Sequence, residues 1–210
     1  MSEGLELLAA IGIEPATVVD VGASDGRWSR QARSAFPAAE FVLFEPQPAH
    51  RAALESFRNE DGGATIIPCA AGGRTGSSPF LAPNLFGGAL QESETADSIT
   101  VPVVTLDETL AAATPPFLVK LDTHGAEAAI LAGAQLTLSR SIAWIIEAYN
   151  YRFAPDSFLF WELCARMVEL GFRPVDLRGV LHRPHDETLW QMDLFFIRAS
   201  WDGFESLSYT

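Results

Sequence analysis

The sequence predicts an α/β fold built on a mostly parallel sheet, and two observations lead to this prediction. Short apolar runs typical of buried strands alternate along the chain with segments whose apolar residues recur at helical spacing. Three of these runs end at or next to an acid, at Asp20, Glu45 and Asp122. Alternating strands and helices form βαβ units, whose ligands bind beyond the carboxyl ends of the strands. The sequence therefore also predicts which edge of the sheet binds a ligand.

The N-terminal third of the chain follows this alternation closely. Leu5 to Ile11 repeats apolar residues at helical spacing and stops before Gly12, so it predicts a helix. Thr17 to Val21 is a continuous apolar run, which is typical of a buried strand. The next expected elements are a helix after Gly26, a strand over Glu40–Glu45, a helix over Ala49–Phe57 and a strand over Thr65–Pro68.

Residues 74–100 break the alternation. Gly, Ser, Pro and Asn interrupt the pattern there, yet the segment also carries apolar residues such as Phe80, Leu81 and Leu90. A long irregular segment with its own apolar side chains is more often a functional cover than a linker. We therefore expect a lid or insertion at 74–100.

The second half of the chain returns to alternating elements. Thr105, with Glu108 three places later, fits a capping box that opens a helix over Leu106–Ala112. The last two strands, Arg173–Leu177 and Asp193–Ile197, are too close for a helical crossover, so we expect them to pair antiparallel. The remaining expected elements are strands over Ile99–Val104, Phe117–Asp122 and Ile142–Glu147, and helices over Ala126–Leu138 and Phe158–Leu170.

Length, charge and cysteine content narrow the class of protein. A chain of 210 residues with 48% hydrophobic content suits one packed domain, which we expect to span residues 1–210. The formal net charge of -13 opposes binding to a phosphate backbone, so we expect no nucleic-acid partner. No apolar run is long enough to cross a bilayer and acids occupy the N-terminal region, so we expect a cytoplasmic protein without a membrane span. Cys69 and Cys164 lack metal-ligand spacing and are interpreted as small core residues.

The stretch VVDVGASDGRWS, residues 18–29, carries the first functional signal. Gly22 and Gly26 let the backbone turn tightly after a strand, with room for a ligand against the following helix. Glu45 follows about twenty residues later, where an acid accepts hydrogen bonds from two ribose hydroxyls. Ser24 and Asp25 stand where a dinucleotide would place its pyrophosphate, and a carboxylate repels that anion. A nucleoside with an amino group and a sulfonium fits better, which points to S-adenosylmethionine rather than a nicotinamide cofactor.

Four segments in order, VVDVGASDGRWS, FVLFEP, VPVVTLDETL and VKLDTHGAEAAILAGA, resemble the FkbM-type methyltransferases over most of residues 7–147. The resemblance implies the Rossmann-like class I methyltransferase fold: a mostly parallel seven-stranded sheet, an antiparallel C-terminal strand and helices on both faces. It also implies S-adenosylmethionine as cofactor and, commonly, O-methylation of sugar or natural-product hydroxyls. By this analogy the glycine loop holds the methionine part of the cofactor, Glu45 the ribose and Ala70 the adenine. The residues expected to bind the cofactor are Asp20, Gly22, Ala23, Ser24, Asp25, Gly26, Trp28, Glu45, Pro46, Ala70 and Asp122.

The fourth segment departs from the family pattern KIDVEGAE, because Thr123 and His124 replace Val and Glu. His124 lies two residues past a strand that ends at the ligand-binding edge, so we expect it to be the general base for an acceptor hydroxyl. Asp122 or Glu147 would orient it, which makes these three the expected catalytic residues. A histidine at this junction could instead cap the next helix. Lys120 shares a strand face with Asp122, which predicts a buried ion pair.

Two other functions remain open at this stage. Asp122, His124 and Glu147 could bind magnesium for metal-assisted transfer, although that ion prefers oxygen ligands to imidazole. The chain could also be an S-adenosylmethionine-binding module without catalytic activity. The expected acceptor is a small molecule or glycan, with Tyr149, Asn150 and Tyr151 as candidates for lining its pocket. The sequence leaves the oligomeric state open, with a homodimer as one alternative.

Overall fold

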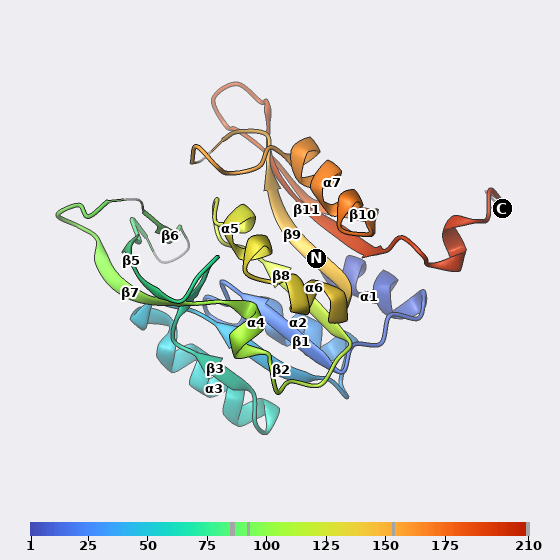
Figure 1. Cartoon of the computed structure of the whole chain (residues 1–210), viewed down its shortest axis with the longest axis horizontal. Helices are drawn as coiled ribbons and strands as arrows, with labels where there is room; N and C mark the ends of the chain where they lie inside the picture. The colour runs from blue at the N-terminus through green and yellow to red at the C-terminus, as the bar shows by residue number, and fades with distance from the viewer. Residues whose placement is uncertain (85–86, 92, 153, 209–210) are drawn as a thin grey trace.

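A computed structural model describes residues 1–84, 87–91, 93–152 and 154–208. Its core is a seven-stranded sheet with the order β10-β11-β9-β8-β1-β2-β3 (Figure 1). The strands are β1 (Thr17–Val21), β2 (Glu40–Phe44), β3 (Thr65–Ile67), β4 (Ala70–Ala71), β5 (Gly76–Leu81), β6 (Ala89–Leu90), β7 (Ile99–Val104), β8 (Phe117–Leu121), β9 (Ser141–Tyr149), β10 (Phe172–His182) and β11 (Leu189–Arg198). The helices are α1 (Ser2–Ala10), α2 (Arg27–Ala35), α3 (Arg51–Asp61), α4 (Leu106–Thr109), α5 (Glu127–Ala132), α6 (Gln135–Arg140) and α7 (Phe160–Glu169), with short 3-10 turns η1 (Pro48–His50) and η2 (Asp202–Phe204).

The strand directions confirm the predicted fold class. β3, β2, β1, β8 and β9 run parallel, β11 runs antiparallel to β9, and β10 runs antiparallel to β11. The two C-terminal strands pair as the short connection predicted, with Arg173 opposite Ile197 and Leu177 opposite Leu194. β10 thus runs in the same direction as these five strands, and all six present their carboxyl ends at one edge of the sheet.

Helices cover both faces of this sheet because its strands bury side chains on both sides. Val19 and Val21 of β1 pack in one core cluster, which also contains residues of α4, α5, α6 and α7. Val18, whose side chain points to the opposite face of the strand, packs in a second cluster with residues of α1, α2 and α3. The alternation along β1 follows the two-residue repeat of a strand, so each strand contributes to two cores.

A second, four-stranded sheet with the order β4-β7-β5-β6 was not predicted from the sequence. Ile99–Val104 is a strand as predicted, but it pairs with β4 and β5 outside the main sheet. The 74–100 segment is less irregular than its composition suggested, since Gly76–Leu81 forms β5. Phe80, Val101 and Val103 are buried together in a small core of their own, which explains why this segment folds.

Tertiary contacts also shorten two predicted helices. The stretch Ala126–Leu138 is two helices, because the Asp107 carboxylate accepts hydrogen bonds from the backbone N–H groups of Leu136 and Thr137 and so caps a new start for α6. α4 ends at Thr109, before the predicted Ala112. Its Thr105 cap is present, since Oγ1 accepts the backbone N–H of Glu108 at 3.2 Å.

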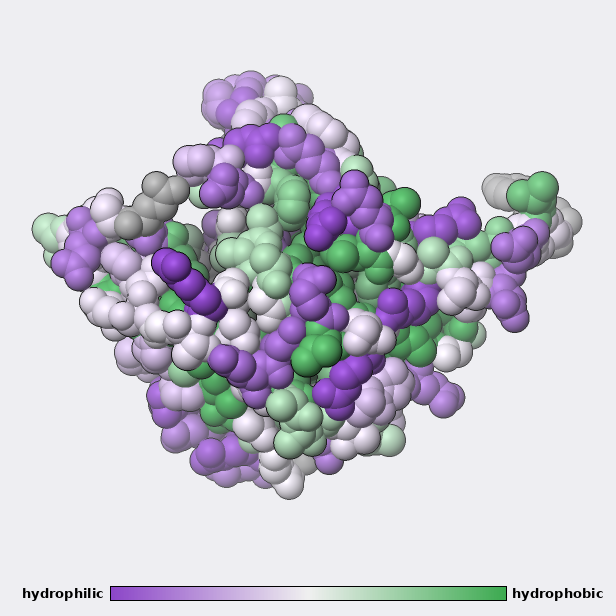
Figure 2. Space-filling view, in the orientation of Figure 1, coloured by the Kyte–Doolittle hydropathy of each residue, from purple (hydrophilic) through white to green (hydrophobic). Residues whose placement is uncertain are grey.

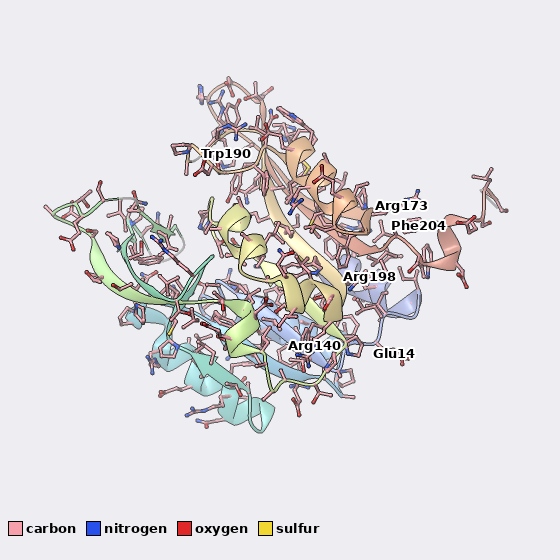
Figure 3. All side chains as sticks on the ribbon, in the orientation of Figure 1. Glu14, Arg140, Arg173, Trp190, Arg198 and Phe204 are labelled. Carbon is pink, nitrogen blue, oxygen red and sulfur yellow. The ribbon has the colours of Figure 1, made fainter. Side chains whose placement is uncertain are left out.

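The outer surface mixes polar and apolar side chains, as the face in Figure 2 shows. The segment after β11 projects from the body (Figure 1), and the guanidinium carbon of Arg173 on β10 lies 4.0 Å from the centre of the Phe204 ring in η2 (Figure 3). Among the described residues, no helix combines the length and the apolar character needed to span a bilayer.

Candidate active site

A cavity of about 320 Å³ lies at the carboxyl ends of the parallel strands, where the main sheet meets the second sheet. We call it the inner cavity. Of the residues that the sequence assigned to a site, it is lined by Gly22, Ser24, Glu45, Pro46, Ala70, Asp122, His124 and Glu147. Sequence reasoning missed other lining residues, among them Gln47, His50, Cys69, Phe80, Gly88 and Gln191. Cys69 is therefore half-buried in a cavity wall and not a core residue.

The other predicted cofactor residues, Asp20, Ala23, Asp25, Gly26 and Trp28, lie outside this lining. Asp20 is fully buried beneath the glycine turn, where the Ser29 hydroxyl donates to its carboxylate at 2.5 Å. The Asp25 carboxylate turns toward Arg27, accepting the backbone N–H and a guanidinium N–H at 3.0 Å each. Both acids therefore support the loop in the structure.

The glycine loop owes its shape to three positions with positive φ, Gly22, Ser24 and Gly26. Gly22 has φ 83°, and a Cβ there would lie 2.1 Å from the backbone oxygen of Asp122 on the neighbouring strand. Only glycine permits this close approach. Ser24 has φ 49°, which is unusual for a residue with a side chain. The loop is thereby bent over the end of β1, with Ser24 facing the inner cavity.

Glu45 holds two backbone segments together from the end of β2. Its Oε2 accepts the N–H of Ser24 and its Oε1 accepts the N–H of Gln47, both at 2.8 Å. Burial raises the pKa of the Glu45 carboxyl, and these two backbone hydrogen bonds oppose the rise. A carboxylate oxygen can accept more than one hydrogen bond, so Glu45 keeps acceptor capacity for a ligand in the cavity.

A buried lysine holds Asp122 in place. Lys120 Nζ is 2.7 Å from Asp122 Oδ2, which is the ion pair predicted from strand alternation. Burial disfavours the ammonium, but the carboxylates of Asp122 and Asp20 outweigh it and keep the pKa of Lys120 above its usual range. Burial likewise opposes ionisation of Asp122, and Lys120 outweighs it, so the pKa of Asp122 is lowered. Asp122 therefore faces the cavity as a fixed carboxylate.

His124 lies between two carboxylates and the second sheet. Its Nδ1 is 3.1 Å from the backbone oxygen of Gly88, and a carbonyl can only accept, so Nδ1 carries the proton. Nε2 then faces Glu147 Oε2 at 3.6 Å and Asp122 Oδ1 at 3.8 Å. His124 has φ 52°, so it is a second strained residue at this cavity.

Glu147 is buried near the carboxyl end of β9. The Tyr149 hydroxyl donates to its Oε2, and the Gln191 side-chain amide donates to its Oε1. Burial and, next, the neighbouring Asp122 carboxylate raise the pKa of Glu147. Asp122 and Glu147 therefore favour a state in which Asp122 is ionised and Glu147 holds a proton. Glu127, at the start of α5, accepts hydrogen bonds from Gly125 N and Thr123 Oγ1 and supports the loop before that helix.

A second cavity of about 690 Å³ opens next to the first and shares His124, Leu90 and Gln191 with it. We call it the outer cavity. It lies between the second sheet and the loop after β9, and Trp190 at the start of β11 forms part of its wall (Figure 3). The Trp190 ring is 6.1 Å from that of Tyr149, which also lines the cavity, and 5.1 Å from that of Tyr151. Among its described lining residues there is no Asp, Glu, Lys or Arg.

The same three residues offer a candidate metal site. One ligand atom each from Asp122, His124 and Glu147 lies within 4.8 Å of the others. Two oxygens and one imidazole nitrogen would suit a first-row transition metal better than magnesium. The geometry therefore keeps metal-assisted transfer as an alternative.

Comparison with known proteins gives the family. The model of the methyltransferase FkbM domain matches residues 20–174, which is most of the chain. The chain belongs to the FkbM methyltransferase family. S-adenosylmethionine, the cofactor expected from the sequence, is the cofactor of this class of methyltransferase. No curated protein matches the sequence.

Solved structures similar to this FkbM-family chain agree on the fold. The methyltransferase FkbM from Methylobacillus flagellatus KT has a TM-score of 0.57 at 17% identity, covering 85% of this chain and 43% of that one. Sp1610 of Streptococcus pneumoniae, named as a candidate tRNA (m1A22) methyltransferase, has a TM-score of 0.52 at 13% identity, covering 94% and 70%. PH1948 of Pyrococcus horikoshii, a candidate RNA methyltransferase, has a TM-score of 0.51 at 16% identity, covering 94% and 83%. At these identities the similarity shows the class I fold alone, and the chain spans less than half of the FkbM structure.

Proposed function

We propose that the chain is an S-adenosylmethionine-dependent O-methyltransferase that acts on a hydroxyl of a small metabolite, sugar or natural product. The observation that carries this proposal is the position of His124. Its ring lines both cavities, so one side of it can face a cofactor and the other an acceptor. A positioned imidazole at that boundary is suited to take the proton of a hydroxyl during methyl transfer.

The residues of the inner cavity fit the proposed cofactor. Glu45 offers carboxylate oxygens to the ribose hydroxyls, and Ala70 with Phe44 offers apolar surface to the adenine. The ionised Asp122 suits the cationic end of the cofactor, and the cavity volume is within the range of small-ligand sites, roughly 300–1,000 Å³.

S-adenosylmethionine, when bound, supplies an electrophilic methyl group, so the chain must orient the acceptor, exclude water and remove one proton. The Gly88 carbonyl holds the proton of His124 on Nδ1 and leaves Nε2 to receive the acceptor proton. The ionised Asp122 faces this nitrogen at 3.8 Å, and its charge favours the imidazolium that results, while Glu147 Oε2 lies 3.6 Å from the same nitrogen. The second sheet closes the cavity on the side of Phe80 and Leu90, which keeps water away.

The outer cavity is the proposed acceptor site. Its wall combines the rings of Trp190 and Tyr149 with the side-chain amides of Asn84, Gln91 and Gln191. Rings offer an apolar face and amides offer donors and acceptors without net charge, so the wall favours an uncharged hydroxylated acceptor. The absence of basic residues among its described lining residues, together with a net charge of -13, supports a small-molecule acceptor over a nucleic acid.

The test is His124→Ala, assayed by S-adenosylhomocysteine release against sugars, glycolipid headgroups, phenols and polyketides. We expect the variant to bind cofactor normally and to lose roughly 10²–10⁴-fold in turnover. His182→Ala on β10, a histidine outside both cavities, is the matched control and should keep full turnover. Near-normal turnover of His124→Ala would exclude it as the base, and cofactor binding without turnover on any acceptor would favour a binding module.

The metal alternative has its own observation, the three converging ligand atoms of Asp122, His124 and Glu147. It predicts that chelation with EDTA abolishes turnover and that a divalent metal restores it. Our main proposal predicts turnover that survives EDTA. The same assay, run with and without chelator, separates the two mechanisms.

A further inference from the structure

His50 lies in the wall of the inner cavity and takes no part in the methyl transfer proposed above. It ends η1 immediately before α3, and only 5% of it is exposed. Its Nε2 is 3.4 Å from Oγ of Ser24, which belongs to the glycine loop. Its ring is also close enough to Glu45 to lower the pKa of that carboxyl against the effect of burial. His50, Ser24 and Glu45 therefore form one polar cluster at the cavity wall.

The backbone of Ser24 indicates that its side chain has a function. Its φ of 49° lies in the left-handed region, where glycine is the residue without strain. Gly22 and Gly26, on either side, do have glycine at their positive φ values. A strained residue that lines a cavity is a reason to look for a role of its side chain. The feature that serine adds over glycine is the hydroxyl, and this hydroxyl faces His50.

The chemistry of the cluster matches a pair of neighbouring hydroxyls. Each ribose hydroxyl both donates and accepts hydrogen bonds. Ionised Glu45 can only accept, so it satisfies the donating half of the diol and leaves the diol oxygens without donors. An imidazole N–H and a serine O–H are donors of the type that is missing. We propose that His50, together with Ser24, binds the ribose hydroxyls of S-adenosylmethionine beside Glu45, an inference that rests on the proposed cofactor site.

Calorimetric titration of S-adenosylhomocysteine and of its 2′,3′-dideoxy analogue tests this inference without an acceptor. His50→Ala should weaken binding of S-adenosylhomocysteine by roughly 3- to 10-fold, the loss expected for one or two hydrogen bonds. The same substitution should leave binding of the dideoxy analogue nearly unchanged, because that ligand lacks the hydroxyls. His50→Gln keeps a donor and should retain part of the affinity. Arg51→Ala, at the next position and outside the cavity lining, is the control and should bind both ligands like the wild type.

Ser24→Gly is a variant in which we expect thermal stability and cofactor affinity to change in opposite directions. It relaxes the backbone, so we expect an equal or higher melting temperature together with weaker binding of S-adenosylhomocysteine. Equal losses for both ligands, or no loss in His50→Ala, would overturn the inference while leaving the proposed function intact. Failure of the wild-type chain to bind S-adenosylhomocysteine would overturn both.

Discussion

Backbone strain is concentrated at the residues that face the inner cavity. Three non-glycine residues in the described part of the chain have positive φ, and two of them, Ser24 and His124, line this cavity. The third, Glu187, lies in the turn between β10 and β11. Each such residue costs roughly 1–3 kcal/mol, which surrounding packing must offset. Ser24 is held by Glu45 and His124 by Gly88, so the residues proposed to act on ligands are also fixed by specific partners.

Glu45→Ala should weaken cofactor binding and also lower stability. The carboxylate is proposed to bind ribose, and it also accepts the N–H groups of Ser24 and Gln47 at 2.8 Å each. Leaving buried donors without acceptors costs roughly 1–3 kcal/mol. We expect a lower melting temperature and at least a tenfold loss of S-adenosylhomocysteine affinity by calorimetry. Glu45→Gln keeps one acceptor oxygen and should lose less of both, and an unchanged affinity in Glu45→Ala would remove this residue from the site.

At the scale of elements, the second sheet and the main sheet meet at His124. β6 is joined to β5 by only two pairs of residues, Phe80 with Leu90 and Leu81 with Ala89. Gly88 immediately precedes β6, and its carbonyl contacts Nδ1 of His124 at 3.1 Å. We therefore propose that the lid also orients the proposed base, through the contact between Gly88 O and His124 Nδ1.

Gly88→Ala tests the link between the second sheet and the base. A Cβ at this position would lie 2.3 Å from Cζ of Phe80, so the Phe80 ring or the Gly88 backbone must shift, and we expect the buried ring to displace the backbone and with it the carbonyl that contacts His124. We expect a loss of turnover with S-adenosylhomocysteine affinity largely kept, and a change in the tautomer of His124 in ¹⁵N NMR spectra recorded with EDTA present. Phe80→Ala in the same chain makes room for the methyl group and should restore part of both. A wild-type tautomer in Gly88→Ala would show that the carbonyl does not control the ring.

Hydrogen exchange tests whether the segment behaves as a lid. Within Ser77 to Glu94, we expect amides of residues 87–91 to gain protection when S-adenosylhomocysteine and an acceptor bind, because β6 has few partners of its own. β7 is paired on both sides, with β4 and β5, so its amides should already be protected without ligand. Protection of 87–91 that does not change with ligand would make this stretch an ordinary surface loop.

The molecule as a whole combines a net charge of -13 with acids buried near one lysine. Burial raises the pKa of both Asp20 and Asp193 to about 6, and Lys120 opposes the rise in both cases. The ordinary value is 3.8 for each, so between about pH 4 and pH 6 the folded chain binds protons that the unfolded chain has lost. The free energy of unfolding therefore falls as the pH rises through this window.

The melting temperature should therefore also fall as the pH rises. We expect the melting temperature to be several degrees higher at pH 5 than at pH 7, and repulsion among the remaining acids acts in the same direction. Asp193→Asn cannot ionise, so its melting temperature should depend less on pH. Asp97→Asn, an exposed acid without a resolved role in the fold, serves as the control and should keep the wild-type slope. A wild-type melting temperature that rises from pH 5 to pH 7 would contradict the prediction.

The sequence by itself determined the fold class, the family and the edge of the sheet that carries the site. A strand or helix buries side chains at positions that repeat every few residues, so this burial is visible as a local sequence pattern. The apolar run Thr17–Val21 and the helical spacing of Leu5–Ile11 are examples. Because the strands run parallel, their carboxyl ends meet at one edge of the sheet, and the acids at those ends are therefore expected to gather there. The ion pair between Lys120 and Asp122 was predictable for the same reason, as both lie on one strand face.

Only the tertiary structure decided which of these residues face the cavities. Asp20 and Glu45 both end strands, yet Asp20 is covered by Ser29 and Glu45 is open to the inner cavity. His124 meets Gly88 across 36 residues, and Ser24 meets His50 across 26, so neither contact leaves a local pattern. Such contacts depend on how separate elements pack, and packing distances between distant residues are set by the whole core and not by the periodicity of any one segment.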